Sequence, residues 1–106
     1  ETTFAHMKPG MIIANTSRGG VIDEKALLNA LNLEQIHAVG LDVFEQEPPS
    51  SKLELCNRDD TLLSPHIAGL TDKASERMAL ACIDNAIDYL NGTINPNLIV
   101  NKEALR

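Results

Sequence analysis

The side chains of one arginine, one histidine and a group of carboxylates could together carry out acid–base chemistry on a small carboxylic acid. Arg18 has a planar guanidinium that can hold a carboxylate through two hydrogen bonds. His66 has an imidazole, the kind of side chain that can give or take one proton near neutral pH. A glutamate beside the histidine would fix its tautomer, and Glu45 and Glu47 are the candidates. This set of residues favours carboxylate binding combined with proton transfer.

These residues follow short apolar runs that are typical of buried strands. The predicted strands are residues 11–14, 36–44 and 61–64. Arg18 comes in the polar loop after the first strand, Asp42 at the end of the second, and His66 after the third. Ligands bind outside the carboxyl ends of the strands in open α/β sheets, so we expect these side chains to gather at one sheet edge.

A first full helix is predicted between the first two strands. Asp23 is placed as its N-cap, and the helix extends to about Asn32. Ile22 and Leu27 have the spacing of a hydrophobic staple. Leucines 27, 28 and 31 fall on one helical face, which we expect to be buried in the core.

A long last helix is predicted to begin at Thr71 or Asp72 and to end at Gly92. Its apolar positions between Ala79 and Leu90 recur every three or four residues, so this stripe is also expected to be a core face.

Residues 1–6 are predicted to be helical. Residues 45–60 are predicted to be a surface loop with a helical turn near 52–56, and residues 98–100 a docking strand or an extended stretch.

The order of these elements indicates an α/β fold with a parallel sheet. Three strands and two helices hardly supply the cover that a parallel sheet needs on both faces. We therefore interpret the chain as the second half of a larger doubly wound domain.

Composition excludes several classes of function. The 106 residues hold 9 Lys and Arg against 15 Asp and Glu, a net charge of −6, which argues against a nucleic-acid-binding surface. No apolar run approaches the roughly 18 residues of a membrane span, and no signal-peptide core is visible. Cys56 and Cys82 form no CxxC pattern, so we expect no metal site and a reducing, cytoplasmic setting.

Each candidate site residue also has a purely structural interpretation. Arg18 could be a solvated loop arginine, and Asp42 could bind turn amides. Glu45 and Glu47 could be exposed charges, and His66 could bond to nearby backbone. Spacing alone does not decide between these alternatives.

Three ordered motifs resemble the D-isomer-specific 2-hydroxyacid dehydrogenases, including their phosphoglycerate dehydrogenase-like members. MKPG at 7–10 followed by NTSRGGVID at 15–23 is similar to the segment around the family's catalytic arginine. GLDVFEQEP at 40–48 is similar to its aspartate-and-glutamate segment, and SPHIAG at 64–69 to its catalytic histidine segment. The resemblance covers most of the chain and implies a Rossmann-type NAD-binding domain.

The resemblance implies a role for each matching residue. Arg18 would bind the substrate carboxylate, and His66 would protonate the carbonyl oxygen as hydride arrives from reduced nicotinamide. Glu47, and not Glu45, occupies the position that pairs with the histidine. The residues implied to contact the cofactor, which is NAD with NADP also open, are Thr16, Ser17, Arg18, Asp42, His66 and Gly69.

One departure from the family is large. No glycines here have the G-x-G-x-x-G spacing that would hold a dinucleotide pyrophosphate, and no separate substrate domain is visible. We expect residues 1–92 to be the C-terminal part of the NAD-binding domain and residues 93–106 a tail. The isolated chain is expected to be inactive, so the site describes a longer parent protein.

The resemblance implies an oxidoreductase that acts on a D-2-hydroxy acid and its 2-keto acid. Phosphoglycerate, glyoxylate or hydroxypyruvate, and simple D-2-hydroxy acids are all open as substrates, and the parent is expected to be a homodimer. The alternative is a dinucleotide-sensing binding protein on the same fold, similar to the corepressor relatives, which keep the same three residues.

Overall fold

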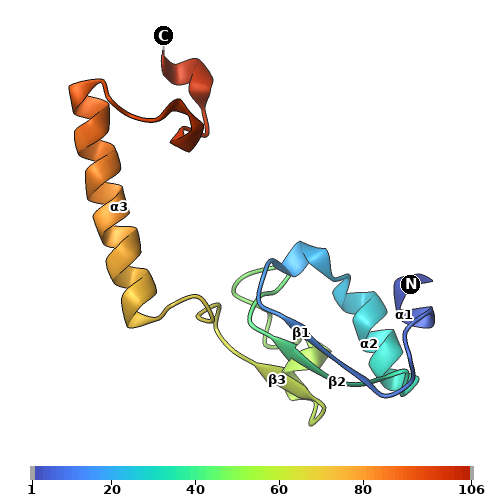
Figure 1. Ribbon diagram of the computed structural model, residues 1–106. Helices are drawn as coiled ribbons and strands as arrows, with labels where there is room; N and C mark the ends of the chain where they lie inside the picture. The colour runs from blue at the N-terminus through green and yellow to red at the C-terminus, as the bar shows by residue number, and fades with distance from the viewer. Residues whose placement is uncertain (1, 106) are drawn as a thin grey trace. The chain divides into compact units, whose positions relative to one another are not determined.

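The computed structural model describes residues 2–105 as two compact units that divide after Gly69. The first unit contains the sheet and two helices, and the second contains one long helix and a tail (Figure 1). The predicted domain limits, 1–92 and 93–106, fall elsewhere in the chain and remain a prediction.

The sheet has three parallel strands in the order β1-β2-β3. They are β1 (Met11–Asn15), β2 (Ile36–Leu41) and β3 (Thr61–Leu63). The register pairs Asn15 with Leu41 and Leu41 with Leu63, so all three strands end at the same level. The residues that follow them therefore leave the sheet side by side, as the α/β prediction requires.

The strand β2 is shorter than predicted. It ends at Leu41, whereas the apolar run suggested an end at Phe44. Val43 and Phe44 are buried, but the amide of Phe44 donates to the carboxylate of Glu47 and not to a neighbouring strand. The apolar run thus continues into the core after the ladder has ended.

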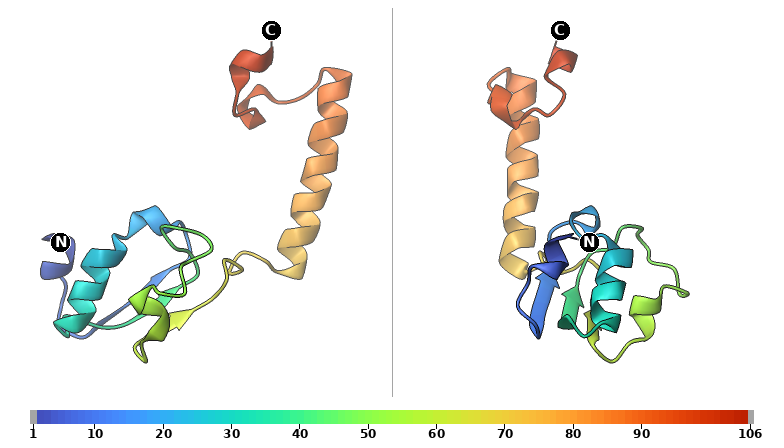
Figure 2. Two further views of the ribbon diagram at one scale, coloured as in Figure 1. Left: turned by 180° about the vertical axis from the view of Figure 1, so that it is seen from behind. Right: turned by 90° about the vertical axis from the view of Figure 1, so that its right-hand side faces the viewer.

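Helix α2 (Glu24–Asn32) lies against one face of the sheet and provides much of the core (Figure 2). Asp23 is its N-cap, as predicted, since its carboxylate accepts a hydrogen bond of 2.8 Å from the Ala26 amide. Leu27 and Leu31 are buried together with Val39 of β2. Helix α1 (Thr2–Ala5) contacts α2 and confirms the predicted helical start for these four residues, whereas His6 is in a turn and residue 1 lies outside the described residues.

The long loop after β2 is fixed at two points. A 3₁₀ turn, Glu54–Asn57, forms close to the predicted helical turn and inserts Leu55 into the core. Arg58 then binds both carboxylate oxygens of Asp60 at 2.7 Å and the side chain of Asn32 at the end of α2. The paired charges and hydrogen bonds lower the pKa of Asp60 and raise that of Arg58.

The second unit contains α3 (Asp72–Asn91) and short 3₁₀ turns. Thr71 caps the helix through the Ala74 amide, and Gly92 ends it with a left-handed φ of 70°, as predicted. No strand forms at 98–100, where Ile99 is extended after a 3₁₀ turn. None of the described helices is long and apolar enough to cross a bilayer.

The prediction that the apolar stripe of α3 is a core face is wrong for the part of the chain that the structure describes. No residue of α3 is buried, and Ile83, Ile87 and Leu90 are all more than half exposed. The reason is that the unit offers only short turns beside one long helix, with no second layer to cover the stripe.

The core assignment can be tested by replacing Leu27 with Ala. This side chain is fully buried, so we expect the free energy of unfolding to fall by about 2–5 kcal/mol. Leu33→Ala is the matched control, because Leu33 is 68% exposed and its loss should cost less than about 0.5 kcal/mol. Urea unfolding of both variants measures the difference, and equal losses would contradict this core.

Candidate active site

The loop that carries Arg18 is shaped by Asn15, the last residue of β1. Its buried side chain accepts hydrogen bonds from the amide and the hydroxyl of Ser17, at 3.1 and 2.8 Å. Its amide group also donates to the carbonyl of Arg18, at 2.9 Å. The chain therefore turns tightly after the strand, and the guanidinium of Arg18 is left exposed at the carboxyl edge of the sheet.

Gly19 allows this loop to lie directly against the segment that follows β2. A Cβ atom at this position would lie 1.8 Å from the carbonyl oxygen of Phe44 and 2.5 Å from the amide nitrogen of Glu45. Only glycine permits such an approach of two backbones. The arginine loop and the segment 44–47 are thus in contact.

Asp42 holds the segment that contains His66. Its carboxylate is buried and accepts hydrogen bonds from the Ser64 hydroxyl at 2.5 Å and from the amides of Ile67 and Ala68 at 2.9 Å. The Ser64 hydroxyl is the largest cause of a lowered pKa of Asp42, the two amides add to it, and burial acts against it. Asp42 is therefore an ionised anchor between the ends of β2 and β3.

His66 has an unusual backbone conformation within this segment. Its φ is 55°, in the left-handed region, which costs a non-glycine residue about 1 kcal/mol or more. The amides of the next two residues are both bound by Asp42, which stabilises this conformation. The strain marks a position where the surrounding structure fixes a side chain.

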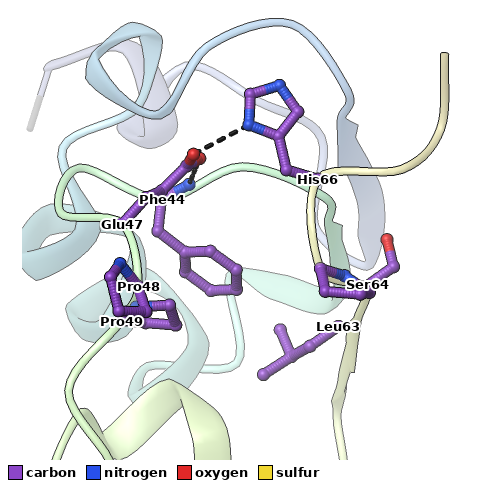
Figure 3. Close-up of a pocket in the computed structure, with 8 residues that line it drawn as sticks. Phe44, Glu47, Pro48, Pro49, Leu63, Ser64 and His66 are labelled. Carbon is purple, nitrogen blue, oxygen red and sulfur yellow. Dashed lines mark hydrogen bonds and ion pairs between the residues drawn. The ribbon is translucent and has the colours of Figure 1, made fainter. Parts of the chain in front are cut away.

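The side chains of Glu47 and His66 form a direct pair, as Figure 3 shows. Glu47 Oε2 lies 2.7 Å from His66 Nδ1, and its Oε1 accepts from the Phe44 amide at 3.0 Å. The bond to His66 is the main cause of the lowered pKa of Glu47, the Phe44 amide adds to it, and the charges of His66 and Arg18 contribute less. An ionised carboxylate only accepts hydrogen bonds, so Nδ1 carries the hydrogen and Nε2 is left to interact with a ligand.

The pair borders an apolar cleft of about 380 Å³. The eight residues that line it are Phe44, Glu47, Pro48, Pro49, Leu63, Ser64, Pro65 and His66 (Figure 3). This volume is at the lower end of the range for small-molecule sites. The cleft thus gives the pair an apolar wall on one side.

The residues singled out in the sequence therefore have different surroundings. Glu47 contacts His66, and Arg18 is close enough for its charge to act on Glu47. Glu45 instead accepts a hydrogen bond from the Glu24 amide. Thr16 and Ser17 are exposed, as is Gly69, at which a side chain would meet open space.

Three residues that shape the site were not assigned a role from the sequence. Asn15 and Ser64 are the polar residues at the ends of β1 and β3, so their position was a usable signal. Gly19 gave no such signal, because the backbone that it contacts lies some 25 residues further along the chain.

The chain is similar to known proteins over most of its length. The family model described as "D-isomer specific 2-hydroxyacid dehydrogenase, NAD binding domain" matches residues 1–68. Glyoxylate/hydroxypyruvate reductase B of Shigella boydii serotype 4 (strain Sb227) is 45% identical over 96 residues, which cover 91% of this chain and 30% of that protein.

Solved structures give the same result. A glyoxylate reductase described as from "Paecilomyes thermophila" is 40% identical with a TM-score of 0.75, over 82% of this chain and 26% of that one. D-lactate dehydrogenase from Aquifex aeolicus, complexed with NAD and lactic acid, is 30% identical with a TM-score of 0.77, over 87% of this chain and 32% of that one. The predicted Rossmann-type fold is confirmed, and the chain spans about a third of the length of these relatives.

The contact at Gly19 predicts a difference between two adjacent glycines. Gly19→Ala would force its Cβ into the Phe44 carbonyl, so we expect a loss of about 3 kcal/mol in the free energy of unfolding. Gly20→Ala is the control, because a Cβ there meets no atom within 4 Å. Urea unfolding compares the two, and a G19A variant as stable as G20A would show that the two backbones are not in contact.

The lowered pKa of Asp42 predicts a pH dependence of stability. A carboxyl group with a lowered pKa in the folded state stabilises the fold fully above its unfolded pKa, which is about 4, and loses this effect as pH falls through the lower folded value. The stability difference between the wild type and Asp42→Asn should therefore be largest above about pH 5 and shrink below about pH 4. Urea unfolding from pH 7 to 2.5 measures it, with Asp59→Asn as an exposed control. A difference that does not change with pH would contradict this assignment.

Proposed function

The chain belongs to the D-isomer specific 2-hydroxyacid dehydrogenase family, and on this premise we propose that its parent protein transfers a hydride between NAD(P) and a 2-hydroxy acid/2-keto acid pair. The observation that carries the proposal is the 2.7 Å contact between Glu47 and His66 at the carboxyl edge of the sheet. Arg18 precedes Gly19, whose backbone contacts the segment that carries Glu47.

His66 is proposed to move the proton. With Nδ1 bonded to Glu47, Nε2 of the protonated ring can donate to a substrate carbonyl oxygen as that oxygen becomes an alkoxide. In the opposite direction the neutral ring accepts the hydroxyl proton at the same nitrogen. Glu47 keeps the orientation of the ring and the hydrogen on Nδ1.

Arg18 is proposed to bind the substrate carboxylate. Its guanidinium is exposed and retains free donors, because among the described residues its one hydrogen bond is from Nη1 to the carbonyl of Ser17 at 2.6 Å. A planar fork of this kind can hold a carboxylate through two hydrogen bonds and so orient the adjacent carbonyl. This grip would present the carbonyl oxygen to His66.

The residues present are suited to the nicotinamide end of a dinucleotide. Thr16 and Ser17 are exposed beside Arg18, and Gly69 leaves open space for a close approach. Oδ2 of Asp42 accepts only the Ala68 amide among the described residues, so it retains an acceptor position. The bound nicotinamide would supply the hydride, whereas the pyrophosphate would need a glycine-rich turn that this sequence lacks.

The substrate class is proposed from the relatives. The curated relative at 45% identity is a glyoxylate/hydroxypyruvate reductase, so these two short 2-keto acids are the first substrates to test.

We also propose that residues 1–92 form the C-terminal part of the NAD-binding domain in a cytoplasmic homodimer. The resemblance to the family supports this assembly.

Replacing His66 with Asn in the parent protein tests the proposal. Asn cannot transfer a proton at neutral pH, so we expect reduction of glyoxylate and hydroxypyruvate by NADH or NADPH to fall at least about 100-fold. His37→Asn is the matched control, because His37 is an exposed histidine of β2 outside the site. Steady-state rates measure the effect. Full activity in H66N would contradict the acid–base role, and an inactive wild type would contradict the proposed function.

A further inference from the structure

Glu24 and Glu45 are joined by two reciprocal hydrogen bonds. The amide of Glu24 donates to Glu45 Oε1 at 3.0 Å, and the amide of Glu45 donates to Glu24 Oε1 at 2.8 Å. Two carboxylates would ordinarily repel each other. Here Glu24 is the first residue of α2, where free amides and the helix dipole favour negative charge.

This reciprocal pair connects α2 to the segment that carries the predicted catalytic carboxylate. Glu45 lies next to Phe44, whose amide binds Glu47, and two residues before Glu47 itself. On its other side the segment is in contact with Gly19. Residues 44–47 are therefore held both by the helix N-terminus and by the arginine loop.

The orientation of the Glu47 carboxylate depends on two hydrogen bonds, one to His66 and one to this segment. Its two carboxylate oxygens are bonded to the Phe44 amide and to the imidazole of His66. A shift of the backbone at 44–45 would therefore move one of the two groups that orient Glu47. Through Glu47 it would change the orientation of the His66 ring.

We propose that Glu45, together with Glu24, is a positioning residue for proton transfer at His66. The inference rests on the proposed function, because it concerns the same histidine. Arg18 has a further anchor that does not involve Glu45, since the Asn15 side chain at the end of β1 bonds to its loop. Loss of the Glu24–Glu45 pair should therefore slow the proton-transfer step and leave substrate binding nearly unchanged.

The experiment uses the full-length protein that contains this sequence. In Glu45→Ala we expect kcat for glyoxylate reduction to fall roughly tenfold with a change in KM of less than about twofold. Glu24→Ala should have a similar effect, because it removes the other half of the pair. Glu45→Gln retains the oxygen that accepts from Glu24 and should restore most of kcat.

Gln46→Ala is the matched control. Gln46 is the adjacent exposed residue of the same segment, and its change should leave kcat and KM unaffected. Wild-type kcat in E45A would overturn the proposal. An E45Q variant as slow as E45A would also overturn it, because the accepted hydrogen bond would then not be the cause.

Amide hydrogen exchange separates this proposal from the proposed function. In E45A the amides of Glu24 and Phe44 should exchange at least about tenfold faster than in the wild type, because the segment is released from α2. If the wild type proves inactive, the proposed function fails, and the exchange rates still decide whether the pair orders residues 44–47. Unchanged exchange at these amides would overturn the positioning role in either case.

Discussion

A buried carboxylate must accept hydrogen bonds to offset its lost hydration, and Asp42 obtains three of them from the segment after β3. These bonds connect the ends of two neighbouring strands and stabilise the left-handed backbone of His66. The Glu47–His66 contact depends on this conformation, because it determines where the imidazole leaves the chain. The buried carboxylate of Asp42 is thus a precondition for the Glu47–His66 contact, and both carboxyl groups have lowered pKa values.

The loop of Arg18 is also held by hydrogen bonds to a buried polar side chain, which here is an amide. Asn15 is a buried amide at the end of β1, and it uses both its donor and its acceptor to shape the loop of Arg18. Since Asn15 and Leu41 are register partners, the two anchored segments leave the sheet as neighbours. Gly19 then brings them into contact. The arrangement of the site therefore results from strand register, two side-chain anchors (Asn15 and Asp42) and the close backbone approach at Gly19.

Much of the first unit could be predicted from the sequence, because its signals are local. Residues close in sequence determine the Asp23 cap, the leucine face of α2 and the start of each strand. The end of β2 could not be predicted, since it depends on where the Phe44 amide finds its acceptor. The apolar residues of α3 recur with the spacing of a buried helix face. This spacing does not show which element would cover them, and in the structure they are exposed. The contact at Gly19 was missed for the same reason, because it is tertiary.

The location of the site within one unit has a consequence for its chemistry. Arg18, Glu47 and His66 all lie before Gly69, and every hydrogen bond described for them joins residues of that unit. These hydrogen bonds are made by the ends of the strands and the loops that follow them. The sequence nevertheless lacks the glycine-rich turn that binds a dinucleotide pyrophosphate. The mutual arrangement of Arg18, Glu47 and His66 and the binding of a pyrophosphate would thus depend on different stretches of chain, and only the first is built into these residues.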